Sequence, residues 1–348
     1  MKKKIFLFLP FLDEFISKSE RGKRLKKDGK KLATTTINNY KNLRKLLVAF
    51  EQTQPEPLRI IAVNKLSQKE MIVEKNYWKR FYKRFSEFLY KRGVYDNYVG
   101  MVFKSLKVVF KFIQQEKLIN VGEFYKQFHV LKEEVPIITL MPEQLKFLIQ
   151  NTDFEKEFSD TEKEVRDIFV FGCTVALRFS DLFSIRVKDV EAVLGNYYLS
   201  VQSQKTETLT RVKLPEYAVA IINQFKKGKT ANTKLFPFYS LFWFNKNLKR
   251  IAEKLGWTYE IGKSRSKMGV SYGINKSNKK SYRFCDMISS HIMRRTAITT
   301  MLMHEVPERV VRKISGHSEG SKAFGRYVNL VQSYIDESID RHYERMGV

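Results

Sequence analysis

Three stretches in the first third of the chain repeat apolar side chains every three or four residues, which is the spacing of one face of an α-helix. They cover residues 34–50, about 74–91 and about 96–116. The recurring apolar residues are Ile37, Tyr40, Leu43, Leu47, Phe50, Trp78, Phe81, Phe85, Phe88, Leu89, Val99, Val102, Leu106, Val109, Phe110 and Ile113. Amphipathic helices bury such faces by packing against one another. We therefore expect a small all-helical domain over residues 34–130.

A second domain is expected over residues 141–348, after a linker at residues 131–140 that contains Pro136. Pro142 is placed to open the first helix of this domain, because proline is favoured at the first helical position. The apolar spacing predicts that most of the domain is helical.

A strand pair is predicted at residues 197–204 and 210–214, where apolar and polar side chains alternate. Lys205 stands at the tip of the predicted hairpin. Residues 258–284 are polar and rich in lysine, serine and glycine, so a loop or an irregular hairpin is expected there. The predicted fold class is mainly α with a small antiparallel β-sheet (α+β).

The N-terminal residues 1–33 are expected to form a basic arm, because residues 18–32 carry eight lysines or arginines. Such an arm is either solvated or laid along DNA. The apolar run at residues 5–12 resembles a signal peptide only briefly, since Pro10 interrupts it and no small-residue cleavage site follows. We expect this run to begin a short helix that packs on the body of the protein.

The charge balance points to a polyanionic partner. The sequence has 64 Lys plus Arg against 37 Asp plus Glu, a formal net charge of +27. Nucleic acid fits best, because each neutralised phosphate releases counterions; an anionic membrane surface and an RNA scaffold are alternatives. No run approaches the roughly 20 apolar residues of a membrane span. The only cysteines, Cys173 and Cys285, indicate neither a disulfide framework nor a metal site, and suit a reducing cytoplasm.

A basic stripe runs along the second predicted helix, opposite the face that carries Trp78. An ordinary solvated face would look the same, but the net charge favours phosphate contact. The stripe consists of Lys79, Arg80, Lys83 and Arg84.

Five residues of types that handle phosphate mark the second domain, four of them within its last 58 residues. Guanidinium groups bind non-bridging phosphate oxygens, imidazoles hydrogen-bond to them, and a phenolic oxygen can attack phosphorus. Together these groups can break and rejoin a nucleic-acid backbone without a metal, a cofactor or ATP. The five residues are Arg178, His291, Arg294, His317 and Tyr327.

The motifs around these residues resemble those of the tyrosine recombinase (phage integrase) family. The best-matching stretches are residues 174–182, 290–296 and 310–318, closed by Tyr327, and the resemblance covers about residues 34–348. Each stretch alone is a weak signal, whereas all of them in the family's order are a strong one.

The resemblance implies an all-helical core-binding domain that contacts DNA, followed by a tyrosine-recombinase catalytic domain with a C-terminal tail helix. Its implied partner is double-stranded DNA, bound by a homo-tetramer that assembles through the tail; a tail that packs on its own domain is the alternative. No cofactor and no membrane contact are implied. The expected location is the cytoplasm, at the nucleoid of a bacterial or phage and mobile-element host cell.

The resemblance also assigns roles to the residues that handle phosphate. Arg178 and Arg294 would bind the non-bridging oxygens, with paired N–H donors that lysine cannot match. Asp181, three residues after Arg178, would orient its guanidinium. His291 and His317 would hydrogen-bond the phosphate, and His291 would help to accept the tyrosine proton.

Tyr327 would be the nucleophile, and Lys205 would protonate the leaving 5′ oxygen. Tyr327 stands ten residues after His317, one residue farther than is usual in the family. We expect the turn at residues 318–321 to take up the additional residue, and Tyr334 is the alternative nucleophile. Arg295 is a further candidate for DNA contact.

Three other functions share some of these features. A catalytically inert DNA-binding protein of the same fold would need a misplaced nucleophile, and the spacing of the tyrosine is the one hint of that. A type IB topoisomerase-like enzyme would use similar residues as a monomer to relax DNA. A metal-dependent nuclease is disfavoured, because the acidic residues show no cluster along the sequence.

Overall fold

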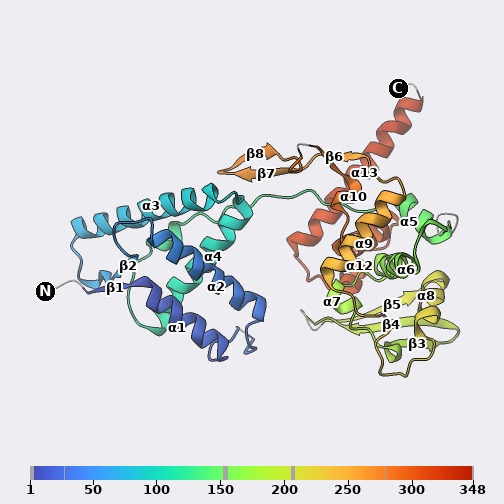
Figure 1. The fold of residues 1–348 in the computed structure, drawn as a ribbon, viewed down its shortest axis with the longest axis horizontal. Helices are drawn as coiled ribbons and strands as arrows, with labels where there is room; N and C mark the ends of the chain where they lie inside the picture. Colours follow the sequence, from blue (N-terminus) through green and yellow to red (C-terminus); the bar gives the residue numbers. More distant parts are fainter. Residues whose placement is uncertain (1–3, 27, 152–155, 205–207, 279, 347–348) are drawn as a thin grey trace. The chain divides into compact units, whose positions relative to one another are not determined.

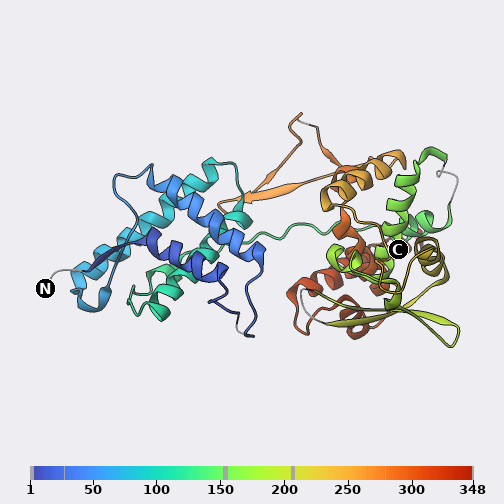
Figure 2. The same cartoon turned by 60° about the horizontal axis from the view of Figure 1, so that its bottom comes forward.

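The computed structural model describes residues 4–26, 28–151, 156–204, 208–278 and 280–346. Its chain divides into two compact units, which are coloured along the sequence in Figures 1 and 2. The first comprises Met1–Val135 and Ser264–Ile274, and the second comprises Pro136–Lys263 and Asn275–Val348. None of the helices in the described ranges is long and apolar enough to cross a membrane.

The first unit contains the three expected helices packed through their aromatic faces. Ser67 caps the second of them in a capping box with Glu70, so that this helix begins earlier than its apolar spacing predicts. Phe85 and Phe103 are fully buried at the centre of the unit. Its helices are α1 (Phe8–Glu20), α2 (Thr34–Glu51), α3 (Gln68–Lys91) and α4 (Asp96–Glu116), with the short 3₁₀ turns η1 (Val63–Lys65) and η2 (Phe124–Gln127).

The short helix expected to begin in the apolar run at residues 5–12 is present as α1 and is part of the core, so the expected basic arm does not extend over all of residues 1–33. Its residues Phe8, Leu12 and Phe15 are fully buried. Arg24 follows the helix and stacks on the Phe15 ring, 3.6 Å from its centroid. The basic run at residues 18–32 begins in the last turn of this helix and lies mostly after it.

Two small antiparallel pairs complete the first unit. β1 (Ile5–Leu7) pairs with β2 (Arg59–Ile61), and β7 (Ser264–Lys267) pairs with β8 (Val270–Gly273). The β7–β8 hairpin is held by the buried carboxylate of Asp96, which accepts the backbone N–H groups of Met268 and Gly269, both at 2.8 Å. The expected single domain at residues 141–348 is therefore wrong for this hairpin, which packs with the first unit.

The second unit is mainly helical and carries one three-stranded antiparallel sheet in the order β3-β4-β5, beside α8 in Figure 1. The predicted pair of strands is present, with Leu199 opposite Val212, and a third strand adds to it. The elements of the unit are α5 (Pro142–Gln150), α6 (Asp160–Val175), α7 (Phe179–Leu182), η4 (Val187–Asp189), β3 (Val190–Val193), β4 (Asn196–Gln202), β5 (Leu209–Leu214), α8 (Glu216–Lys226), α9 (Leu241–Lys254), β6 (Glu260–Ile261), β9 (Tyr282–Arg283), α10 (Phe284–Met287), α11 (Ser290–Met303), α12 (Glu308–Ser315) and α13 (Lys322–Met346).

Helices α6 and α11 pack closely at the centre of the second unit. Gly172 of α6 faces Met293 of α11, and a Cβ atom at Gly172 would lie 2.4 Å from the Met293 sulfur. Met293 and Phe171, which precedes Gly172 in α6, are both fully buried. The close approach matters because Arg178 follows the end of α6 by three residues and Arg294 lies on α11.

Candidate active site

Arg178 lies where α6 ends and α7 begins. Ala176 closes α6 in the left-handed conformation, with φ 55°, and turns the chain so that Arg178 caps α7. The Arg178 guanidinium donates a hydrogen bond to the Ser203 hydroxyl at 3.0 Å and lies 3.8 Å from the carboxylate of Asp181. Its position is therefore fixed by the end of β4 as well as by its own turn.

Asp181 is almost completely buried and connects Arg178 to the sheet. Its carboxylate accepts the Ser203 hydroxyl and the Gln204 backbone N–H, each at 3.0 Å. One carboxylate thus holds the turn of Arg178 and the base of the β4–β5 connection. Lys205, the predicted general acid in that connection, lies outside the described residues.

Arg294 projects from α11 and is 4% exposed. Its guanidinium donates to the Ala176 carbonyl oxygen at 2.9 Å and lies 3.2 Å from Nε2 of His317. His291, one turn earlier on α11, keeps contact with solvent. Arg295, the next residue, interacts with the side chain of Tyr327.

His317 is presented by the end of α12. Gly316 adopts the left-handed conformation, with φ 61°, and closes the helix. The backbone N–H of His317 then returns to the carbonyl oxygen of Arg312 at 2.9 Å. Nδ1 of His317 lies 2.8 Å from the Ser315 hydroxyl, so a residue at the end of the same helix also holds the ring.

Tyr327 lies in the first turns of α13 and is 6% exposed. Its ring centroid is 6.1 Å from that of His317, and its side chain packs in a small apolar cluster with Ala176 and Phe324. Residues 318–321 form the turn between α12 and α13. The tyrosine that follows His317 by ten residues thus lies beside the histidine and both arginines of α11.

The charges at this site are positive and poorly solvated. Burial, together with the charge of Arg178, lowers the pKa of Arg294 to about 10, so that it stays cationic at neutral pH. Burial, followed by the nearby arginines, lowers the pKa of His317 to about 4. Partial burial and the charges of Arg295, Arg294 and Arg178 lower the pKa of His291 to about 4 as well. Two neutral imidazoles among guanidinium groups form a site that favours an anion.

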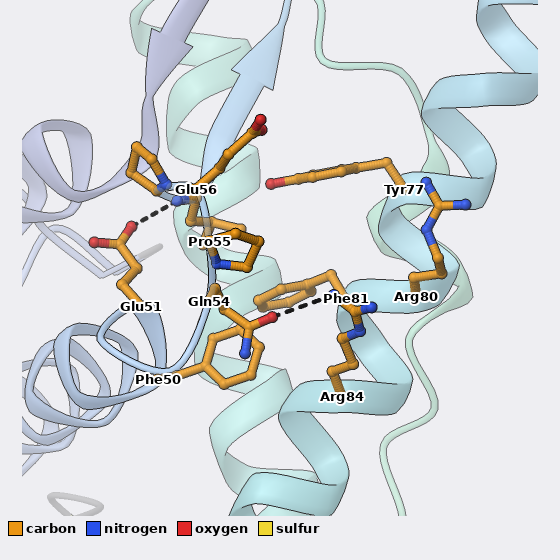
Figure 3. A pocket seen from close by; sticks show the side chains of 11 residues that line it. Phe50, Glu51, Gln54, Pro55, Glu56, Tyr77, Arg80, Phe81 and Arg84 are labelled. Carbon is orange, nitrogen blue, oxygen red and sulfur yellow. Dashed lines mark hydrogen bonds between the residues drawn. The ribbon is translucent and has the colours of Figure 1, made fainter.

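The basic stripe lies on the surface of the first unit. Lys79, Arg80, Lys83 and Arg84 are all exposed on α3, opposite its buried Trp78. Figure 3 shows the hollow beside Arg80 and Arg84, where the Arg84 guanidinium donates to Gln54 in the turn after α2 at 3.4 Å. The volume of this hollow is about 170 Å³. Throughout the described part of the chain, no group of three or more His, Cys, Asp or Glu is placed to hold a metal ion.

Two site residues escaped the sequence analysis. Ser203 and Ser315 are both buried and each contacts a predicted site residue. Serine is common, and neither residue stands out by periodicity. The one available signal is position, because Ser203 lies two residues before Lys205 and Ser315 two before His317.

A comparison with known protein families supports the resemblance of the motifs around Arg178, Arg294 and His317. The sequence profile of the phage integrase family matches residues 139–333, more than half of the chain. The chain belongs to this family, that of the tyrosine recombinases. No curated protein sequence matches it significantly.

Solved structures show the same fold at low sequence identity. The Tn1549 transposon integrase in complex with circular intermediate DNA is 14% identical, with a TM-score of 0.56, over 92% of this chain and 95% of that one. The XerH site-specific recombinase bound to palindromic difH is 13% identical, with a TM-score of 0.57, over 95% of each chain. A fragment of lambda integrase bound to DNA is 14% identical, with a TM-score of 0.52, over 91% and 93%.

Proposed function

We propose that this protein is a site-specific DNA recombinase that cuts and rejoins strands through a covalent 3′-phosphotyrosyl intermediate. One observation carries the proposal: Arg178, Arg294, His317 and Tyr327 come from four different elements and meet at one place. The family to which the chain belongs and the DNA complexes formed by proteins of the same fold support it further.

In the proposed reaction the scissile phosphate enters between the guanidinium groups of Arg178 and Arg294. The pentacoordinate transition state carries more negative charge than the diester, and preorganised N–H donors stabilise that added charge. The Tyr327 oxygen attacks phosphorus, its proton passes to His291, and the bond from phosphorus to the 5′ oxygen breaks. Lys205 would give the leaving oxygen its proton. Attack by a 5′ hydroxyl of the exchanged strand reverses these steps, so rejoining needs no ATP.

The histidines change role when the phosphate arrives. In the free protein both are neutral at pH 7, because their pKa values lie near 4. A phosphate anion beside them raises the pKa of each ring, since it stabilises the protonated form. Proton uptake would then turn His317 into a hydrogen-bond donor to the phosphate.

The exposed basic stripe of α3 would contact the DNA backbone. Its four cations lie on one helix face and have access to solvent. Phosphate contacts of this kind position a protein on the duplex without reading its sequence. The Arg295 side chain would act at the nucleophile instead, because it interacts with Tyr327.

The tail of α13 would connect protomers in a tetramer on DNA. Val331 is buried, whereas the apolar residues beyond it, Ile335 and Ile339, are 43% and 45% exposed. They are four residues apart and therefore share one face of the helix. An exposed apolar stripe at the end of a helix fits a neighbouring copy better than it fits water.

The proposal is tested by trapping the covalent intermediate. The protein is incubated in EDTA with host genomic DNA, denatured, and the sites that carry attached protein are mapped and rebuilt as short duplexes. Tyr327→Phe is expected to abolish the adduct and to leave DNA binding intact, whereas the control Tyr334→Phe keeps it. An adduct that persists in Tyr327→Phe, or that requires magnesium, contradicts the proposal.

A further inference from the structure

The hydroxyl of Ser315 has a defined hydrogen-bond direction. It lies 2.6 Å from the carbonyl oxygen of Val311 and 3.4 Å from that of Arg312. A carbonyl oxygen can only accept, so the single hydroxyl hydrogen of Ser315 points to these atoms. Toward its other neighbours the Ser315 oxygen therefore presents only a lone pair. Ser315 is 1% exposed, so no water competes for it.

This direction decides which nitrogen of His317 carries the proton. Nδ1 lies 2.8 Å from the Ser315 oxygen, which can only accept there. Nδ1 must therefore be the N–H donor, and in the neutral ring Nε2 holds the lone pair. A neutral imidazole in water prefers the opposite tautomer, with hydrogen on Nε2. Ser315 thus holds His317 in its less common form.

The Nδ1–H tautomer of His317 also provides the acceptor that Arg294 needs. A guanidinium has donors only, so it needs an acceptor in His317. Its terminal nitrogen lies 3.2 Å from Nε2 and 3.4 Å from Nδ1, and of these only the unprotonated Nε2 can accept. The other terminal nitrogen is held by the Ala176 carbonyl.

A continuous set of hydrogen bonds, each with the same direction, therefore runs from Arg294 through His317 and Ser315 to Val311. The structure assigns to Ser315 the role of a positioning residue that fixes the Nδ1–H tautomer of His317 and thereby orients the Arg294 guanidinium. Its contribution to catalysis rests on the proposed function, whereas the tautomer itself does not.

The tautomer is measured in the full-length free protein by long-range ¹H–¹⁵N NMR with ¹⁵N-labelled histidine at pH 7. The chain has five histidines, and His317→Gln identifies the signals of His317. We expect Nδ1 to be protonated and Nε2 to be bare in the wild-type protein. A wild-type ring with hydrogen on Nε2 overturns the inference without any variant of Ser315.

Variants then separate this role from a structural one. Ser315→Ala is expected to shift His317 toward the Nε2–H tautomer and to slow adduct formation about tenfold, the effect of one hydrogen bond, with DNA affinity unchanged. Ser315→Thr, which keeps the hydroxyl, is expected to retain the wild-type tautomer. The matched control is Ser105→Ala on α4, which removes a similar bond to a carbonyl four residues earlier, of 3.0 Å, in the other unit.

The possible outcomes separate the role of Ser315 from the proposed function. An unchanged tautomer in Ser315→Ala overturns the inference even if activity falls, because the loss would then be structural. If Ser315→Ala does not fold, the wild-type and Ser315→Thr spectra decide. If the wild-type protein forms no adduct with DNA, the proposed function fails, and the NMR result still tests Ser315.

Discussion

The guanidinium of Arg294 donates a hydrogen bond of 2.9 Å to the carbonyl oxygen of Ala176, which lies 118 residues earlier in the chain. Ala176 is the left-handed residue that ends α6 and turns the chain toward Arg178. One arginine of the site therefore holds the turn that presents the other. The two guanidinium groups are positioned as a pair, before any phosphate is bound.

Arg294→Lys should lower the rate of adduct formation by about 10²–10³-fold, the usual effect of losing a preorganised donor to the transition state. Lysine keeps the charge but cannot reach the Ala176 carbonyl, Nε2 of His317 and a phosphate oxygen together. Single-turnover cleavage and a DNA-binding titration check this, and affinity should change only slightly. A loss of affinity as large as the loss of rate would show that the residue acts in binding alone.

Asp181→Asn should slow adduct formation at least about tenfold and destabilise the fold by about 1–3 kcal/mol. The wild-type carboxylate accepts hydrogen bonds from two donors, whereas the asparagine amide would turn its N–H₂ group, itself a donor, toward one of them. Those donors are the Ser203 hydroxyl and the Gln204 N–H. Urea denaturation and the cleavage assay measure the two effects. The exposed Asp160→Asn is the control, and equal behaviour of the two variants would argue against the role of Asp181.

Gly172→Ala should destabilise the second unit by about 1–3 kcal/mol, the cost of overpacking, and slow cleavage as well. The added methyl would lie 2.4 Å from the sulfur and 3.1 Å from the Cβ of Met293. Urea denaturation measures the change, and the double variant with Met293→Ala should recover part of it. Gly262→Ala, where the added Cβ would meet nothing within 4 Å, serves as the control.

The free energy of unfolding should fall between about pH 6.5 and pH 4, partly through His317. Its ordinary pKa of 6.5 applies to the unfolded chain, whereas its folded pKa is about 4. As the pH drops through this window, the unfolded chain binds a proton that the folded ring does not bind. The free energy of unfolding therefore falls by at most about 1.4 kcal/mol per pH unit. Above pH 6.5 the ring is neutral in both states, and the effect vanishes.

Urea denaturation of the wild-type protein and of His317→Gln across this pH range tests that expectation. The variant lacks the titrating ring, so its free energy of unfolding should fall less steeply with acid. Parallel curves for the two proteins would show that the folded pKa of His317 is not lowered.

Lys79→Gln and Lys83→Gln should each weaken DNA binding to all sequences and reduce the slope of log affinity against log salt by about one. Both side chains are exposed on the basic stripe of α3. Binding titrations at several salt concentrations measure the slope. Lys111→Gln, an exposed lysine on α4, is the matched control, and an equal change in this variant would remove the special role of the stripe.

The sequence by itself was enough to predict α2, α3 and α4 of the first unit, the β4–β5 pair, and the candidate site residues Arg178, Arg294, His317 and Tyr327, but not Ser203 and Ser315. Local side-chain spacing is enough for elements such as α4, because apolar periodicity reports which face a helix buries. The candidate site residues were proposed because the motifs around them resemble those of a known family in the same order. The start of α3 was harder to predict, because the polar residues of its capping box precede the apolar repeat.

Only the tertiary structure decided how these residues contact one another. The bond from Arg294 to Ala176, the contacts of Arg178 and Asp181 with Ser203, and the docking of the β7–β8 hairpin on Asp96 join residues far apart in sequence. Such contacts depend on how helices and strands pack against one another, and the spacing of residues along the chain does not predict that packing. The tautomer of His317 was not predictable either, because it depends on where the hydroxyl of Ser315 points and not on how near the two residues are in the sequence.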